Sequence, residues 1–420
     1  MLSLSSCERH PRPNVVVIVI DTLRADRLPF YGYPKDTMPF LNRLAAKSTV
    51  FAKAYAGSSW TAPATASIFT GLYPFQHGVI MGLLAQKQMI KKNPAIKINR
   101  IPENLRTLPE VFQANGYRTF GISDNANISK RQGFEQGFDK LQCFSHLGAK
   151  AINQKLLELE KEIKSSSRYF LYIHYNDPHR PYKLSLNAEE QSGVRNLDLK
   201  LIYDKELTYV DHRIRELYRR FGWKRDTLIV VTADHGEEMM EKGFYGHGAT
   251  LFNTAIHVPL LFFYPGSKSV APGKVPAAVS TLDILPTLNA LLGFPAIEYL
   301  SGKDISPLLR NSRAASEDRH IYSHLQLKNA NRDDVVHKAS IFKDYKYMYQ
   351  SGGGVSLLFN LVKDPQENRD LYSSNQKLAQ KLAADYFNFE RSCKRFNPDY
   401  VGIKLDKESI EHLKSLGYIQ

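Results

Sequence analysis

The most restrictive feature of this sequence is a run of seven residues, 14–20, which after Asn14 holds only valine and isoleucine and stops at Asp21. A run that is apolar on both faces suits a central strand of a parallel sheet, where helices cover both sides. Folds of this kind place their ligand sites at the carboxyl ends of the strands. Asp21 is therefore the first candidate for a functional residue.

The rest of the chain alternates in the same way. The patterns predict further strands at 117–122, 168–174, 227–232 and 256–263, and helices at 37–47 (with Thr37 as N-cap), 61–70, 107–115, 155–164, 201–221 and 283–292. Alternating strands and helices predict an α/β fold, an α/β/α sandwich around a mostly parallel sheet of the alkaline-phosphatase kind.

The pattern changes after about residue 320. Segments 339–349 and 355–361 flank three glycines at 352–354, which predicts a hairpin, and 375–389 predicts a helix packed on it. We therefore expect an N-terminal segment at 1–13, a catalytic domain at 14–320, and a small antiparallel C-terminal subdomain with a terminal helix at 321–420.

Charge and cysteine content narrow the function. Lys and Arg total 56 and Asp and Glu 42 among 420 residues, a formal net charge of +14. This surplus favours anionic partners, although solubility alone also explains it, and no segment is typical of a nucleic-acid-binding module. The three cysteines form neither a disulfide scaffold nor a zinc site.

The N-terminus suggests a location. Leu4-Ser5-Ser6-Cys7 resembles the lipobox of bacterial lipoproteins, although the apolar core of a signal peptide is missing. No apolar run approaches the length of a membrane span. We expect the cell envelope or the extracellular side, with membrane contact through a lipid anchor; the alternative is a cytoplasmic protein.

Four blocks carry residues suited to chemistry, and three of them follow predicted strands. Asp21 ends the first, Thr61 opens a predicted helix in the second, and the third and fourth contain histidines and an aspartate. The blocks are Asn14–Asp26, Ser59–Gly71, His174–His179 and Thr232–Glu237, with His247 and His257 behind the last.

These blocks, in this order, resemble the sulfatase family of the alkaline phosphatase superfamily. Residues 359–368 are similar to that family's C-terminal signature, and 409–418 to its terminal helix. The resemblance implies that Thr61 is the nucleophile. It also implies that Asp21, Thr61, Asp234 and His235 bind one divalent metal ion.

The chemistry of these side chains agrees with that implication. Two carboxylates and an imidazole suit Mn, Mg or Zn, and Ca is expected if the protein is sulfatase-like. The metal would lower the pKa of the Thr61 hydroxyl, and the helix start beside it would supply backbone N–H donors for an anionic ester.

The departures from the family pattern bear on the reaction. Sulfatases have a cysteine, converted to formylglycine, where this chain has Thr61, and Asp-Asn where it has Asp234-His235. Formylglycine can expel sulfate by breaking its own C–O bond, which a threonine sulfate cannot do. The set is also similar to the threonine site of lipoteichoic-acid synthases and phosphoethanolamine transferases, which use Glu at the position of Asp21.

The sequence therefore predicts hydrolysis or transfer of a phosphoester, as by a phosphodiesterase, phosphatase or phosphotransferase, through a covalent Thr61 intermediate. The alternatives are a sulfuric ester hydrolase that works without formylglycine and an inactive sulfatase-fold binding protein. The substrate would be an anionic phosphate or sulfate ester, lipid- or glycan-linked, with specificity set by loops such as 82–100 and 183–196.

Further residues complete the candidate site. His247 is expected to protonate the leaving group, and His174 and His179 to bind the ester or activate the incoming nucleophile; a structural role is the alternative for each. Asn125 and Asn127 lie where sulfatases carry a Lys-x-His pair and are expected to contact substrate. Asp177 has no companions for a second metal, and His257 is expected to be structural.

Overall fold

The computed structural model describes residues 12–83, 85–86, 99–182, 198–314, 317–327 and 334–396. The lipobox-like Cys7, the terminal helix expected at 409–418 and most of the two expected specificity loops lie outside these ranges. Within them, no helix is both long and apolar enough to cross a lipid bilayer.

A nine-stranded sheet forms the centre of the molecule. Its strands run in the order β11-β2-β10-β6-β1-β5-β3-β4, with β9 paired to β2. Every pairing is parallel except those that β9 and β10 make. The strands are β1 (Asn14–Ile20), β2 (Thr49–Tyr55), β3 (Arg118–Ser123), β4 (Lys140–Cys143), β5 (Tyr169–Tyr175), β6 (Thr227–Thr232), β9 (His257–Val258), β10 (Leu260–Phe263) and β11 (Gly273–Ser280).

The predicted central strand is confirmed. β1 lies between β5 and β6 and is parallel to both. Val16, Ile18 and Ile20 point into one apolar core and the three intervening valines into another. The alternation within a uniformly apolar strand therefore divides the molecule into two cores, one on each face of the sheet.

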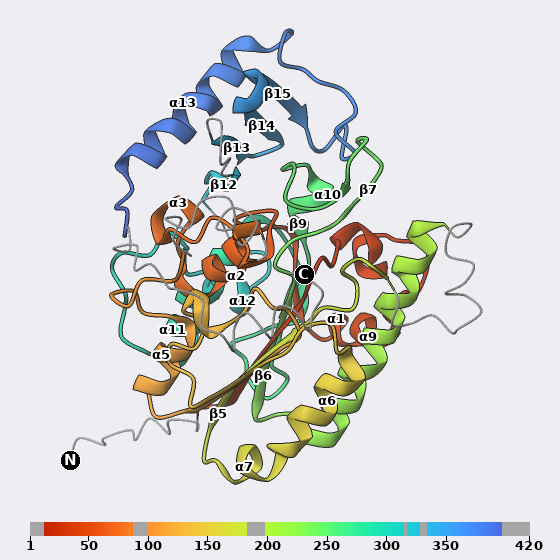
Figure 1. Ribbon diagram of the computed structural model, residues 1–420, viewed down its shortest axis with the longest axis vertical. Coiled ribbons are helices and arrows are strands. Elements are labelled where there is room, and N and C mark those ends of the chain that lie inside the picture. Colours follow the sequence, from red (N-terminus) through yellow and green to blue (C-terminus); the bar gives the residue numbers. More distant parts are fainter. Residues whose placement is uncertain are drawn as a thin grey trace, which may run out of the picture.

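Helices cover both faces, as an α/β sandwich requires (Figure 1). One layer holds α1 (Pro39–Ala45), α6 (Ala149–Glu158), α7 (Glu160–Ser165) and α9 (Leu199–Phe221), and the other α2 (Thr61–Thr70), α5 (Leu108–Ala114), α11 (Ile284–Leu292) and α12 (Ser306–Arg310). Short elements complete the loops: α3 (Pro74–His77), α10 (Asn253–Ile256) and the hairpin of β7 (Glu238–Met239) and β8 (Tyr245–Gly246).

The C-terminal part forms a second, antiparallel sheet. Its strands follow one another as β12 (Ile321–Leu327), β13 (Val335–Phe342), β14 (Tyr345–Gln350) and β15 (Val355–Asn360), and α13 (Gln376–Ser392) packs on β13 and β14. This sheet and its helix lie at one end of the molecule, blue in Figure 1.

The hairpin predicted at the glycines is confirmed between β14 and β15. The expectation of one continuous element at 339–349 is wrong, because the chain turns back between Phe342 and Tyr345. Lys343 takes a left-handed conformation there, with φ of 54°. The turn residues are Lys343 and Asp344, and the left-handed position is taken by the lysine, which is not typical of turns, so the sequence pattern gave only a weak indication of this turn.

Three other elements differ from the prediction in their capping or their continuity, and several more differ only at their ends. The helix expected at 37–47 begins at Pro39, and Thr37 does not cap it but donates its hydroxyl to the carbonyl of Arg27 (2.6 Å). Asp211, far along the chain in α9, instead accepts both free N–H groups of Phe40 and Leu41 at 2.8 Å. This cap depends on a tertiary contact.

The helix expected at 155–164 is two helices, α6 and α7, divided at Leu159. The strand expected at 256–263 is divided into β9 and β10 at Pro259, whose missing N–H interrupts the ladder. Neither break changes the topology.

Candidate active site

Three neighbouring strands bring the candidate residues together. Asp21 directly follows β1, His174 is the sixth residue of β5, and Asp234 and His235 follow β6. Because β5, β1 and β6 are adjacent and parallel, their carboxyl ends share one edge of the sheet. All four side chains are fully buried there.

Asp21, His174 and Asp234 form a group whose potential ligand atoms all lie within 4.8 Å of one another. The Nε2 of His235 also faces both carboxylates, 3.6 Å from Asp21 Oδ1 and 3.5 Å from Asp234 Oδ2. This geometry is that of a site able to hold one metal ion.

Two buried carboxylate oxygens in the cluster have no hydrogen-bond donor, Asp21 Oδ1 and Asp234 Oδ2. An unpaired buried charge is strongly unfavourable in a protein interior unless a cation compensates it. Burial, reinforced by the charge of Asp21, raises the pKa of Asp234 to about 7. The cluster thus fits a divalent cation between the carboxylates, which would supply the missing partner.

The pKa of Asp21 shifts the other way. Burial alone would raise it, but the hydrogen bond with His174 and the charge of His235 outweigh burial and lower this pKa well below its ordinary value. Asp21 is thus the more readily ionised carboxylate of the pair.

His235 is oriented as metal-binding histidines are. Its Nδ1–H donates to the carbonyl of Gly236 (2.8 Å), which leaves the Nε2 lone pair free to face the cluster. The Oγ1 of Thr61 lies 3.2 Å from that Nε2. Thr61, Asp234 and His235 therefore converge as the sequence predicted.

Thr61 is the first residue of α2, a helix that is buried throughout and has the predicted bounds. The residue at the N-cap position is Trp60, so the Thr61 side chain does not serve as the cap. Thr61 thus lies at the amino end of the helix, where free backbone N–H groups suit an anionic group.

Backbone strain is stored next to the cluster. Thr22 has φ of 59°, a left-handed conformation that β-branched residues avoid. Its N–H points at Asp234 Oδ1 (3.4 Å), and its carbonyl accepts from the Tyr203 hydroxyl (2.7 Å). Strained residues concentrate at functional sites, and this one helps to fix a carboxylate.

Asn125 follows β3 by two residues and contacts the cluster. Its Nδ2 donates to Asp21 Oδ2 (2.5 Å) and to Asn176 Oδ1 (2.9 Å). The Nε2 of His174 lies 3.3 Å from the same Asp21 oxygen, and its Nδ1 lies 2.8 Å from the Tyr172 hydroxyl. Both residues were expected to contact substrate, and the structure adds a contact with Asp21 that the sequence did not indicate.

His247 lies beside His235, with 4.5 Å between the ring centroids, and the His179 ring is 4.7 Å away on its other side. The Nδ1 of His247 bonds to Oε1 of the buried Glu237 (2.8 Å). This contact orients the ring and leaves its Nε2 available for a proton transfer. Burial lowers the pKa of His247 to about 4.

Some candidates have structural contacts. The side-chain oxygen of Asn127 accepts from Leu83 N (2.8 Å), so it supports the neighbouring loop. Asp177 accepts from Ala149 N at the start of α6 (2.9 Å) and does not join the metal cluster. His257 bonds to the carbonyl of Ala52 (3.0 Å), as expected for a structural histidine.

Sequence reasoning missed three residues of this region: Asn176, Glu237 and Trp60. Asn176 bonds to Asn125, Glu237 bonds to His247, and the Trp60 ring would lie 3.4 Å from a side chain on Gly248. All three stand inside the motif blocks, so their position next to the predicted residues was the signal that could have found them.

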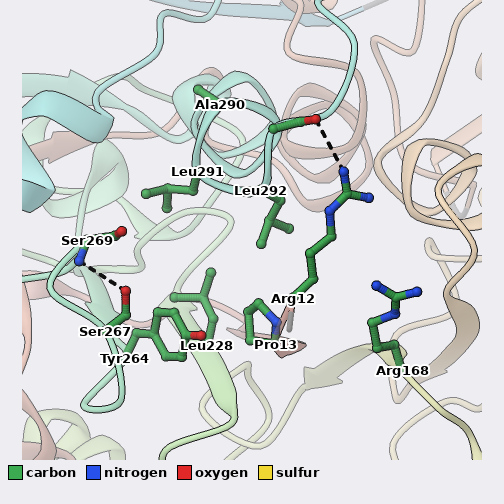
Figure 2. Close-up of a pocket in the computed structure, with 11 residues that line it drawn as sticks. Arg12, Pro13, Arg168, Leu228, Tyr264, Ser267, Ser269, Ala290, Leu291 and Leu292 are labelled. Atoms are coloured by element: carbon green, nitrogen blue, oxygen red, sulfur yellow. Dashed lines mark hydrogen bonds between the residues drawn. The ribbon is translucent and has the colours of Figure 1, made fainter. Parts of the chain in front are cut away.

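A large cavity of about 840 Å³ lies elsewhere, at the amino ends of β1, β5 and β6 (Figure 2). Arg12, Arg168 and Tyr264 surround apolar residues of β6 and α11, and Arg12 bonds to the carbonyl of Gly293 (3.4 Å). None of the predicted site residues lines it.

Comparison with known families agrees with the cluster's position. A family model described as Sulfatase matches residues 13–294, and one described as N-sulphoglucosamine sulphohydrolase, C-terminal, matches residues 240–389. The first match spans more than half of the chain and includes every candidate residue named above. The protein therefore belongs to the sulfatase family.

Individual relatives are sulfatases as well. The chain is 24% identical over 409 residues to an ulvan-active sulfatase of Formosa agariphila, covering 86% of this chain and 77% of that protein. It is 26% identical over 356 residues to arylsulfatase A of Homo sapiens, covering 71% and 68%. It is a member of a hydrolase family that cleaves esters.

Solved structures confirm the fold. A 2-O GAG sulfatase superposes with a TM-score of 0.74 at 18% identity, covering 94% of this chain and 98% of that one. A phosphonate monoester hydrolase of Agrobacterium radiobacter superposes with a TM-score of 0.69 at 19% identity, covering 91% and 96%. The α/β sandwich with a small antiparallel C-terminal sheet is thus confirmed, while the threonine branch of the superfamily stays a prediction.

Proposed function

We propose that this protein is a metal-dependent hydrolase of sulfate esters on an anionic, glycan-like substrate. One observation carries the proposal: the Thr61 hydroxyl faces His235 Nε2 at 3.2 Å within a buried acidic cluster. That cluster lies inside the region that matches the sulfatase family. Relatives named for ulvan and GAG sulfates, and a neighbour solved with a neocarrahexaose, support a sulfated polysaccharide as substrate.

Asp21, Asp234, His235 and Thr61 are the residues that would hold the metal ion. The ion supplies charge compensation and lowers the pKa of the hydroxyl bound to it. Calcium prefers an all-oxygen set, whereas an imidazole suits Mn or Zn better, so His235 favours the latter ions. His174, 4.0 Å from Asp234 Oδ2, would either add a ligand or hold Asp21 in place.

The reaction that these residues support has two steps. The Thr61 hydroxyl loses its proton to solvent, and its oxygen attacks the sulfur of the ester and forms a new O–S bond, while the bond from sulfur to the alcohol oxygen breaks. His247 is expected to give the departing alcohol a proton, and Glu237 keeps its ring oriented. Because burial lowers the pKa of this ring to about 4, the role requires that the charge of the bound anionic ester favour the protonated form. Water then attacks the same sulfur, and the Thr61 oxygen leaves.

The second step distinguishes this chain from sulfatases that contain formylglycine. Thr61 has no second oxygen on its Cβ, so the adduct cannot be released by breaking the Thr61 C–O bond. This favours a second candidate, hydrolysis or transfer of a phosphoester, because water or an alcohol attacks phosphorus readily. The fold shared with a phosphonate monoester hydrolase is compatible with this candidate.

The test is a panel of aryl sulfate, sulfated oligosaccharide, aryl phosphate, phosphodiester and phosphonate, each measured with added Ca, Mn, Mg or Zn. Sulfate turnover supports the first candidate, and phosphoester or phosphonate turnover without sulfate turnover replaces it by the second. Metal binding without any turnover would contradict both and indicate a binding protein.

Thr61→Ala should lower turnover on the active substrate at least about 10³-fold. Thr70→Ala is the matched control, since Thr70 is equally buried at the far end of α2 and bonds only to Ala66 O (2.7 Å). Wild-type turnover in Thr61→Ala with metal present would contradict the nucleophile assignment.

A further inference from the structure

A buried ion pair joins the C-terminal sheet to the edge of the candidate site. Lys346 of β14 has no exposed surface, and Glu367, in the turn after β15, has a side chain that is 2% exposed. The two side chains pair directly. Removal of one partner from such a pair leaves a buried charge without compensation, so these two residues constrain whatever they touch.

The contacts of this pair reach outside the C-terminal sheet. Glu367 Oε2 accepts from the N–H of Asn253, the first residue of α10 (2.6 Å), and Lys346 donates to Asn253 Oδ1 (3.0 Å). Lys242, in the turn between β7 and β8, donates to the Glu367 carbonyl (2.5 Å) and to Asn368 (2.9 Å). The side chains of the pair therefore hold α10, and the turn that carries Glu367 holds the β7–β8 hairpin through its backbone and Asn368.

Both held segments contact the candidate catalytic residues. Gly236, between His235 and Glu237, donates its N–H to Ala255 O of α10 (2.8 Å). A side chain on Gly236 would lie only 2.1 Å from Thr254 O, so the two segments are in tight contact. On the far side of the hairpin, Gly248 N donates to Ser59 O (2.8 Å), two residues before Thr61.

We propose that the Lys346–Glu367 pair is a positioning element for the candidate site. By fixing α10 directly, and the β7–β8 hairpin through the turn that carries Glu367, it sets where His235 and His247 lie relative to Thr61. The C-terminal sheet thus contributes to catalysis through the position of these residues. The catalytic consequence rests on the proposed function, whereas the mechanical coupling can be measured without any substrate.

The first test compares Glu367→Gln with Glu390→Gln. Glu390 pairs with Lys338 in the same subdomain at similarly low exposure, 12% and 13%, but that pair joins α13 to β13 and does not reach the site. Amide hydrogen exchange in the intact protein is followed at Gly236 and Gly248, with β1 as internal reference.

In Glu367→Gln, exchange at Gly236 and Gly248 should become at least about tenfold faster relative to β1, because local opening is eased. In Glu390→Gln, the same ratio should stay within about twofold. Equal ratios in the two variants would overturn the proposal. If Glu367→Gln does not fold, Lys346→Met/Glu367→Gln removes both charges together and takes its place in the same comparison.

The second test uses substrates of the active class that differ in leaving group. If Glu367 positions His247, Glu367→Gln lowers kcat more for an alkyl ester, whose leaving group needs a proton, than for a nitroaryl ester, by about tenfold or more. An equal loss of kcat for both esters would contradict the part of the proposal in which Glu367 positions His247. Faster exchange in a protein with no turnover would leave the coupling standing and reject only the proposed function.

Discussion

The two ends of the central sheet differ: one holds the buried candidate site, and the other holds an open cavity. At the carboxyl end, Asp21, Asp234, His174 and His235 are fully buried, and two carboxylate oxygens have no donor. At the amino end, a cavity of about 840 Å³ opens between Arg12, Arg168 and α11, and its lining, within the part of the chain that the structure describes, holds no such group of ligand atoms.

This difference shows that buried, uncompensated charge identifies the site better than volume does. The carboxyl end gathers repelling carboxylates and the strained Thr22, both of which oppose folding. A natural protein retains such features where a ligand compensates them. The two arginines of the amino end, Arg12 and Arg168, are partly exposed beside the cavity.

The largest effect should follow from neutralising one carboxylate of the cluster. Asp234→Asn is expected to weaken divalent metal binding at least about 100-fold, because it removes a charged ligand. The same change should stabilise the metal-free protein by about 1–2 kcal/mol, because it relieves burial and repulsion from Asp21. Calorimetric titration with Mn and urea unfolding in chelator measure the two effects.

The matched control is Asp226→Asn at the amino end, where Asp226 bonds to the Thr227 hydroxyl (3.1 Å). It should change neither metal affinity nor stability beyond about 0.5 kcal/mol. Equal loss of metal affinity in both variants would remove the distinction between the two ends.

A smaller effect is expected at Glu237, which bonds to His247. Glu237→Gln should lower kcat for alkyl esters about 10- to 100-fold while metal affinity stays near the wild-type value. Nitroaryl esters should be affected less. A uniform loss across leaving groups, or a lost metal, would mean that Glu237 supports the cluster rather than the proton donor.

The loss of stability at acid pH gives a third contrast. We expect it to depend on a residue that affects folding and does not take part in catalysis. Burial lowers the pKa of His77, behind α2, to about 3, against an ordinary value of about 6.5. The unfolded chain takes up a proton below pH 6.5 and the folded chain does not, so His77 makes stability fall as pH drops toward 3. His77→Gln should reduce this slope by up to about 1.4 kcal/mol per pH unit, measured by urea unfolding from pH 7 to 4.

The smallest effect is predicted for the amino-end cavity itself. Arg168→Gln should leave kcat and KM within about twofold of wild type and change stability by less than about 0.5 kcal/mol, since the guanidinium lies beside open space. Steady-state kinetics on the active substrate checks this. A loss of kcat as large as the loss of metal affinity expected for Asp234→Asn would mean that the reaction takes place at the amino end of the sheet.

Much of this arrangement follows from local sequence. The uniformly apolar β1 and the exact bounds of β6 and α2 were predictable, and strand ends then placed Asp21 and Asp234 together. The contacts that refine the site were not, because they join distant residues. Asn125 reaches Asp21 across 104 positions, and Asp211 caps α1 across 170.

Local sequence patterns also gave no correct prediction where the backbone conformation is unusual for the residue type. Lys343 turns the β13–β14 hairpin and Thr22 bends toward Asp234, both with left-handed conformations that neither residue favours. The domain division at 320/321 and the lipid anchor at Cys7 stay predictions.

The most direct test of the central claim is peptide mass spectrometry of metal-loaded enzyme, quenched with acid at intervals through the first turnover of the active substrate. The structure predicts that the peptide containing Thr61 gains the mass of one sulfo or phospho group, with the modification on Thr61 itself. On a sulfate ester this adduct should accumulate, because release requires attack at sulfur. Product formed in excess of enzyme while Thr61 stays unmodified at every interval would contradict the account.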